Sequence, residues 1–279
     1  MSASEIKSYF EFILPLVRAS GELLLEAKEV KVETKGEPWD LVTMYDRKIE
    51  EVLIDKIREE YPKHKFIGEE DSAAKNRIAE LTDDPTWIID PIDGTANFVR
   101  GLPITCISVG FAVKKQVVMG VVFNPYMDEL YYSIKGEGAY LNGTRLQTSG
   151  LEDIDGACFN YELSLARREA LRDLYIYRLK HLIGVTQGIR SLGCAVLGLC
   201  YVAAGIIDAY QCDGLYPWDV AAGSLIVTEA GGHVCDTTGK KELDIMNPNF
   251  LATATKPLSD KFMEIERVAD AERLAKTKK

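Results

Sequence analysis

The sequence predicts a mixed α/β fold in which helices and sheets are stacked in layers. Three patterns indicate this: apolar residues at helical spacing over residues 4–57, β-rich runs over residues 105–141, and alternating strands and helices after residue 188. A chain of 279 residues can bury a substantial core. We therefore expect a single unit spanning 1–279, with two lobes over about residues 1–145 and 146–279.

The first predicted element is a helix from Ser4 to about Lys28, which Pro15 would kink or divide. A loop rich in helix breakers follows at residues 35–40. Thr43 is expected to cap the next helix, with Asp46 in its first turn. The residues predicted to share the buried face of that helix are Ile49, Val52, Leu53 and Ile57.

Two of the next predicted strands end in acidic residues. Phe66 and Ile67 form a short strand that leads into Gly68-Glu69-Glu70. Trp87–Ile89 form a buried strand, and we expect Pro91 to end it because proline has no backbone N–H to donate. Taken alone, paired glutamates after a strand are typical of a polar loop.

Asp90 and Asp93 are three residues apart on a tight turn, so both carboxylates and the Ile92 carbonyl can face one point. Hard oxygen ligands of this kind suit Mg²⁺. Gly94 permits close backbone approach, and Thr95 would place its N–H at a helix start that favours an anion. The run predicts a metal and phosphate site with metal-bound water as nucleophile, although a simple turn with a capping residue is an equally consistent interpretation at this point.

The rest of the chain is predicted as an antiparallel meander followed by alternating elements. The meander strands are 105–113, 117–123 and 129–134, and Asn142-Gly143 is typical of a hairpin turn. Later strands are expected at 158–161, 207–211, 232–235 and 250–254, and helices at 165–183, 195–204, from about 218 and from about 258. The 165–183 helix has several basic side chains, which favour a solvated face over a phosphate-binding patch. These are Arg167, Arg168, Arg172, Arg178 and Lys180.

Composition excludes several classes of function. The 33 basic and 43 acidic residues give a formal net charge of −10, which disfavours nucleic acid as a partner. Residues 1–12 do not resemble a secretory signal and no apolar run is long enough to span a membrane, so we expect a cytoplasmic protein without a membrane partner. The cysteines lack C-x-x-C spacing and are expected to be free thiols, and the histidines lack the spacing of zinc ligands.

A Trp218-Asp219 pair precedes the predicted helix, at a position where an acid usually only caps the helix N-terminus.

These blocks together resemble the inositol monophosphatase family of Mg²⁺-dependent, lithium-sensitive phosphatases. The resemblance lies in the runs Trp87 to Thr95, Gly68 to Glu70, Trp218 to Ala221 and Thr228 to Gly232, and extends from the first helix to about Ala254. It implies a layered αβαβα sandwich of the sugar-phosphatase type, with a largely antiparallel N-terminal sheet, a second smaller sheet and a homodimer. The first lobe would then hold metal and phosphate, and the second lobe the substrate.

The resemblance also implies roles for particular residues. Glu70, Asp90 and the Ile92 carbonyl would hold one Mg²⁺, Asp90, Asp93 and Asp219 a second, and Glu70 would help to hold a third through water. Thr95, aligned by Asp46, would orient or deprotonate the attacking water, and the Gly94 and Thr95 N–H groups would bind the phosphate. The implied catalytic residues are therefore Glu70, Thr95 and Asp46, and Lys35 matches a lysine that approaches the metals.

The residues that would read the substrate depart from the family. The implied substrate contacts are Glu70, Ile92, Asp93, Gly94, Thr95, Gly193, Cys194, Ala195, Cys212 and Asp219. Cys212 stands where well-studied members have a glutamate that accepts hydrogen bonds from ring hydroxyls, and a thiol is a weak acceptor. Asp213 would compensate only if its loop shifted, and Leu165, next to Ser164, replaces a serine that approaches the substrate.

The resemblance implies Mg²⁺-dependent hydrolysis of inositol monophosphates, a small phosphorylated polyol substrate, by direct attack of water with two or three ions per site. One alternative keeps the enzyme class but changes the ester to another sugar, polyol or nucleotide 3′-phosphate. A second alternative is a paralogue that binds phosphate ligands or a protein partner without turnover.

Overall fold

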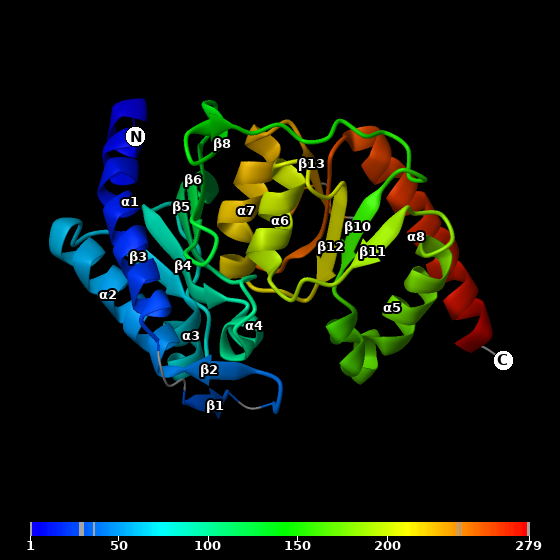
Figure 1. Ribbon diagram of the computed structural model, residues 1–279, viewed down its shortest axis with the longest axis horizontal. Helices are drawn as coiled ribbons and strands as arrows, with labels where there is room; N and C mark the ends of the chain where they lie inside the picture. Colours follow the sequence, from blue (N-terminus) through cyan, green and yellow to red (C-terminus); the bar gives the residue numbers. More distant parts are fainter. Residues whose placement is uncertain (1, 28–30, 36, 239, 241, 278–279) are drawn as a thin grey trace.

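The computed structural model describes residues 2–27, 31–35, 37–238, 240 and 242–277, and its elements form five layers in the order αβαβα (Figure 1). The first layer is α1 (Ala3–Leu25) with α2 (Met44–Glu60), and the last is α5 (Glu169–Leu182) with α8 (Lys256–Thr277). Between the two sheets lie α6 (Ala195–Ala203) and α7 (Pro217–Glu229). The predicted layered fold is confirmed; the division into two lobes stays a prediction.

The larger sheet has the strand order β3-β4-β5-β6-β7-β8-β9. Its strands are β3 (Lys65–Gly68), β4 (Thr86–Asp93), β5 (Cys106–Val113), β6 (Gln116–Asn124), β7 (Glu129–Ile134), β8 (Gly138–Leu141) and β9 (Thr144–Arg145). Strands β3 and β4 are parallel, and each later pair is antiparallel, as the meander predicted. Asn142 and Gly143, with φ of 49° and 84°, form the predicted hairpin turn between β8 and β9.

The smaller sheet has the order β11-β10-β12-β14-β13 and mixes parallel and antiparallel pairs. Its strands are β10 (Cys158–Tyr161), β11 (Gly188–Arg190), β12 (Ala209–Asp213), β13 (His233–Asp236) and β14 (Asn249–Thr253). A short hairpin that the sequence did not predict, β1 (Val32–Thr34) with β2 (Leu41–Thr43), flanks the loop at residues 35–40. Lys28 and Gly36, on which two predictions fell, lie outside the described residues.

Helix α7 lies directly against the larger sheet because two strand residues have no side chain. A Cβ at Gly110 of β5 would lie 2.9 Å from the Cβ of Ala221. A Cβ at Gly120 of β6 would lie 2.8 Å from the carbonyl oxygen of Ala222. Any larger residue at either position would push α7 away from the strands.

The expectation that Pro91 ends its strand was wrong. Strand β4 continues to Asp93, which pairs with Cys106 of β5, and the register shifts between Asp90 and Asp93. A proline is compatible with a strand where a bulge already interrupts the ladder, because no N–H is needed there. The bulge turns the strand end so that Asp90 and Asp93 both reach the same region.

Three helix predictions also need correction. The segment predicted as one helix from Leu165 to Ile183 begins with a 3₁₀ turn, η1 (Leu163–Arg167), and α5 starts only at Glu169 because Arg168 is extended. Val52 is 37% exposed, since it lies at the edge of the buried stripe of α2. Pro15 lies within α1 without dividing it into two helices. Within the described residues, no helix is both long and apolar enough to cross a bilayer.

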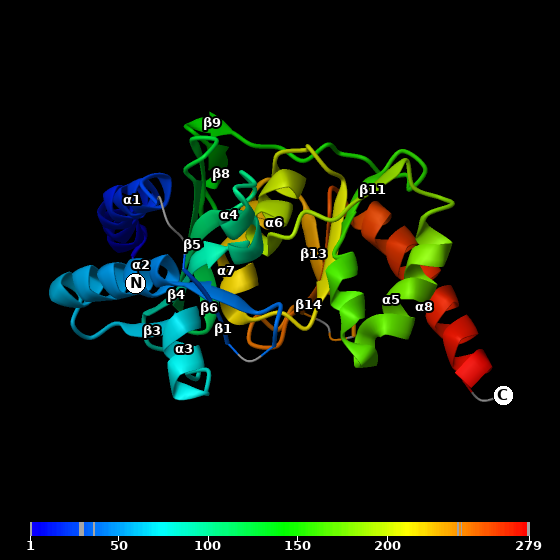
Figure 2. The same cartoon turned by 60° about the horizontal axis from the view of Figure 1, so that its bottom comes forward.

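Arg178 was expected on a solvated face, and it is buried. Its Nη1 lies 3.1 Å from a carboxylate oxygen of Glu266 and 3.6 Å from one of Asp213, and its Nη2 lies 2.8 Å from one of Asp270. Glu266 and Asp270 belong to α8, which packs against α5 (Figure 2). The sequence of α5 alone could not show that this side of the helix would be covered.

The burial of Glu266 makes stability depend on pH. Burial raises its pKa from 4.5 to about 8, although the charge of Arg178 opposes the shift. As the pH rises from about 5 to about 8, the unfolded chain loses a proton that the folded chain keeps, so the free energy of unfolding falls. We expect Glu266→Gln to gain stability relative to the native protein over this range, measured by urea unfolding. A difference that does not change with pH, or an equal gain in the exposed control Glu264→Gln, would contradict this.

Candidate active site

The site forms where three helices begin close to the end of β4. Helix α3 (Glu69–Lys75) follows β3, α4 (Thr95–Arg100) follows β4, and α7 follows the loop after β12. The sequence placed Thr95 and Asp219 at helix starts, whereas Glu69 and Glu70 were expected in a polar loop after a strand. Charged residues from the starts of α3 and α7 lie close enough to the end of β4 that Glu69 and Asp219 both raise the pKa of Asp90.

Asp90, Asp93 and Asp219 form the centre of the site. Each offers a carboxylate oxygen within 4.8 Å of the others. Burial raises the pKa of all three carboxyls, those of Asp90 and Asp219 well above the usual value, and neighbouring negative charges add to the shift. Three converging carboxylates supply the oxygen donors that a hard divalent cation requires. The predicted ligands therefore converge, and their chemistry fits Mg²⁺.

Backbone N–H groups fix the direction of these carboxylates. The backbone N–H of Ile92 donates to Asp90 at 3.0 Å, and that of Val196, in the first turn of α6, donates to Asp93 Oδ2 at 2.6 Å. The backbone N–H of Tyr216 donates to Asp219 Oδ2 at 2.7 Å, as part of a capping box at the start of α7. The simple interpretation of Asp219 as a helix-capping acid is thus also correct, and one carboxylate serves both roles.

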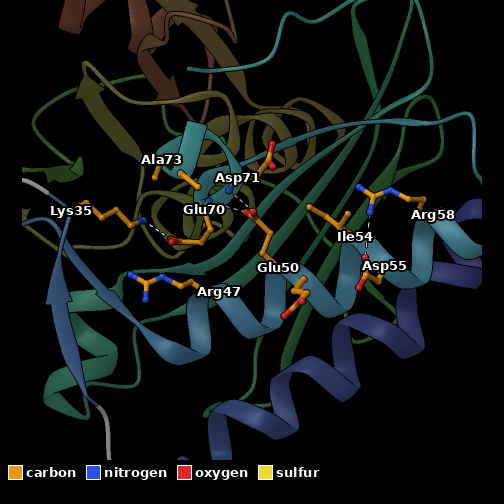
Figure 3. Close-up of a pocket in the computed structure, with 11 residues that line it drawn as sticks. Lys35, Arg47, Glu50, Ile54, Asp55, Arg58, Glu70, Asp71 and Ala73 are labelled. Carbon is orange, nitrogen blue, oxygen red and sulfur yellow. Dashed lines mark hydrogen bonds and ion pairs between the residues drawn. The ribbon is translucent and has the colours of Figure 1, made fainter. Parts of the chain in front are cut away.

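Glu69, which the sequence analysis passed over, faces this cluster more directly than Glu70. The negative charge of Glu69 and a hydrogen bond to its side chain raise the pKa of Asp90. Glu70 lines a depression of about 650 Å³ between α2 and α3, together with Arg47 and Glu50 (Figure 3). Two consecutive residues at the first turn of a helix point in different directions, so the sequence could not assign the metal-facing one.

Lys35 supplies a positive charge beside both glutamates. Its Nζ lies 2.7 Å from Glu69 Oε1 and also contacts Glu70 Oε1, and its side chain is largely buried. The two carboxylates raise the pKa of Lys35 despite its burial. The lysine therefore stays charged next to the acids, and its approach to the metals stays a prediction.

Thr95 and Asp46 are in contact, as expected. Thr95 Oγ1 lies 3.2 Å from Asp46 Oδ1 and 2.9 Å from the Ile92 carbonyl oxygen. The other oxygen of Asp46 accepts the backbone N–H of Thr43 at 2.7 Å, so the predicted cap of α2 is confirmed. Gly94, before Thr95, has a φ of 82° and a Cβ there would lie 2.8 Å from the Ile104 carbonyl oxygen. Only glycine fits this position without strain.

A cavity of about 150 Å³ opens beside Asp93 and Asp219, and its walls come from the second half of the chain. The predicted substrate contacts that line it are Gly193, Cys194, Ala195 and Cys212, and Ser164 and Leu165 line it as well. Asp213 does not compensate for the thiol, because its carboxylate lies 3.6 Å from Arg178 and accepts the Thr237 hydroxyl.

Glu162 is a functional candidate that the sequence analysis missed. It lines the same cavity, and its carboxylate accepts the backbone N–H groups of Leu192 and Gly193, both at 3.1 Å. It also accepts the Ser191 hydroxyl at 3.1 Å. Glu162 therefore holds the loop before α6 in place. Its position directly after the predicted strand at 158–161 was the one available signal.

Comparison with known proteins agrees with this geometry. Residues 6–271 match the inositol monophosphatase family. The chain belongs to this family. Inositol monophosphatase 1 of Bos taurus is 42% identical, with 90% of this chain and 91% of the relative covered. The Homo sapiens inositol monophosphatase 1 is 41% identical, with 94% and 95% covered. A solved structure of the Thermotoga maritima IMPase has a TM-score of 0.81 at 32% identity, covering 95% of this chain and 99% of that one. Membership of the inositol monophosphatase family makes the protein a phosphoric monoester hydrolase.

Asp219→Asn tests the assignment of the carboxylate cluster. The substitution removes one of three mutually repelling charges, while the amide oxygen can still accept the Tyr216 N–H. We expect the metal-free variant to melt at or above the native temperature, and Mg²⁺ to raise the melting temperature of the native protein but not of the variant. Calorimetry with and without Mg²⁺ measures this, with the exposed Asp260→Asn as control. Equal stabilisation of native protein and Asp219→Asn would show that Asp219 is not a ligand.

Proposed function

We propose that this protein hydrolyses inositol monophosphates to inositol and phosphate with the help of Mg²⁺. The observation that carries the proposal is the convergence of Asp90, Asp93 and Asp219 beside the Thr95–Asp46 pair. Family membership supports the inositol ester over the other sugar, polyol and nucleotide phosphates, because the relatives at about 40% identity are inositol monophosphatases.

In this proposal two Mg²⁺ ions would be held by Asp90, Asp93, Asp219 and the Ile92 carbonyl. Glu69 would take the ligand role that the resemblance had given to Glu70. A contact of Glu70 with a third ion through water stays a prediction. Bound Mg²⁺ lowers the pKa of an attached water and stabilises negative charge on the leaving ester oxygen. Lithium sensitivity, a homodimer and a cytoplasmic location remain predictions of the resemblance.

The remaining chemistry belongs to side chains and backbone. The Thr95 hydroxyl donates its own proton to Asp46 in a hydrogen bond and accepts a hydrogen bond from the attacking water, so that attack occurs in line with the leaving oxygen. The backbone N–H groups of Gly94 and Thr95 bind phosphate oxygens. Asp219 and Asp93 form the boundary between this site and the cavity that would take the polyol.

The polyol would lie against Gly193, Cys194 and Ala195, and Cys212 lines the same cavity. A carboxylate in place of Cys212 would give a charge-assisted hydrogen bond to a ring hydroxyl worth about 1.5–3 kcal/mol. We therefore propose that this protein binds its substrate about one to two orders of magnitude less tightly than a site with that carboxylate would.

Thr95→Val tests the role of the hydroxyl. The variant keeps the size of the side chain but removes the group that orients water, so we expect kcat to fall by about 10²- to 10⁴-fold. Thr95→Ser keeps the hydroxyl and should retain most of the activity. Phosphate release under saturating Mg²⁺ measures both. A Thr95→Val enzyme as active as the serine variant would exclude the proposed role.

A substrate panel separates the proposed function from its alternatives. We expect kcat/KM with Mg²⁺ to be higher for inositol 1-phosphate than for glycerol 2-phosphate or a nucleotide 3′-phosphate. Equal values would favour a general polyol phosphatase. Folded protein that releases no phosphate from any member of the panel would instead support a binding protein without turnover.

A further inference from the structure

Two cysteine thiols lie against Asp93 on the inner side of the carboxylate cluster. Asp93 ends β4 and pairs in register with Cys106, the first residue of β5, and Cys194 is the N-cap of α6. Cys194 Sγ lies 3.0 Å from Asp93 Oδ2 and 3.9 Å from Cys106 Sγ. All three side chains are buried, and the Asp93 oxygen and both sulfurs lie within 4.8 Å of one another.

The distances between these three atoms are close to those expected where they all bind one thiophilic cation. With metal–sulfur bonds of about 2.3 Å and metal–oxygen bonds of about 2.1 Å, tetrahedral geometry places two sulfurs about 3.8 Å apart and a sulfur and an oxygen about 3.6 Å apart. The observed sulfur–sulfur distance of 3.9 Å is already in this range. The Cys194–Asp93 contact would lengthen by a fraction of an ångström, which a rotation of the carboxylate allows.

We propose that Asp93, Cys106 and Cys194 form a binding site for a thiophilic divalent cation, Zn²⁺ or Cd²⁺, that shares Asp93 with the all-oxygen site for Mg²⁺. Sulfur ligands select soft or borderline ions, whereas Mg²⁺ prefers oxygen. The cavity that Cys194 lines gives an ion a way in and leaves room for a water as fourth ligand. Each thiol gives up its proton to water as its metal–sulfur bond forms, and the ionised carboxylate binds without releasing a proton.

The site would affect the reaction through its shared ligand. If the proposed function holds, Asp93 binds Mg²⁺, and a cation held by Cys106 and Cys194 draws the same carboxylate toward the thiols. Hydrolysis should then fall as the thiophilic ion binds. Binding itself does not depend on the proposed function and can be measured without substrate.

Cadmium titration of the reduced full-length protein in saturating Mg²⁺ tests the site. Mg²⁺ keeps Cd²⁺ away from a site made of oxygen ligands alone, and the ultraviolet charge-transfer absorption of cadmium thiolates reports sulfur coordination directly. We expect one Cd²⁺ per chain with this absorption, at least a tenfold weaker affinity in Cys106→Ala and in Cys194→Ser, and unchanged binding in Cys235→Ser. Cys235 is a partly exposed thiol that contacts Ser259, away from Asp93, and serves as the matched control.

Circular dichroism and the melting temperature establish that each variant is folded, and the two cysteine positions give independent tests if one variant does not fold. Charge-transfer absorption that appears at the same Cd²⁺ concentration in folded Cys106→Ala or Cys194→Ser as in the native protein would overturn the proposal. So would its loss in Cys235→Ser, or Cd²⁺ binding without thiolate absorption in the native protein. A protein that fails the phosphatase assays but binds Cd²⁺ through these thiols would contradict the proposed function alone.

Discussion

The repulsion between buried carboxylates is the constraint on which the rest of the site depends. Asp90, Asp93 and Asp219 converge in a largely buried position, and burial and neighbouring negative charges raise the pKa of each carboxyl. Backbone N–H groups from the β4 bulge, the start of α6 and the start of α7 hold them in that arrangement. Since α6 and α7 belong to the middle layer, the cluster exists only when both sheets have packed against these helices.

The part of the site that lies within one connection was predictable from the sequence. Asp90 to Thr95 span the end of one strand and the start of one helix, so their spacing alone brings their oxygens and N–H groups together. Asp46 and Asp219 also showed ordinary capping patterns, and both do cap their helices. That they also face Thr95 and Asp93 depends on tertiary packing, which only the family resemblance could supply in advance.

Charged side chains were hard to place from the sequence because neighbouring elements decide which of them are covered. Glu69 and Glu70 differ in direction because a helix starts between a parallel strand and α2, and nothing in two identical residues shows which faces inward. The sequence of α5 predicted a solvated Arg178, but in the structure Glu266 and Asp270 of α8 lie over it. The layered fold was easier to predict, because it follows from the order of apolar runs and turns rather than from any single side chain.

The glycines at positions 110 and 120 set the position of α7 and do not line the cavity beside Asp93 and Asp219. They let α7 rest on β5 and β6, and so determine how far Asp219 stands from the end of β4. Any side chain there would widen the metal site from a distance. Leu165 and Cys212 do not affect the metal site in this way, because they line the cavity beside Asp93 and Asp219 and not the contact between α7 and the sheet. Substitutions at those walls can therefore change the accepted ester while the hydrolytic machinery keeps its dimensions.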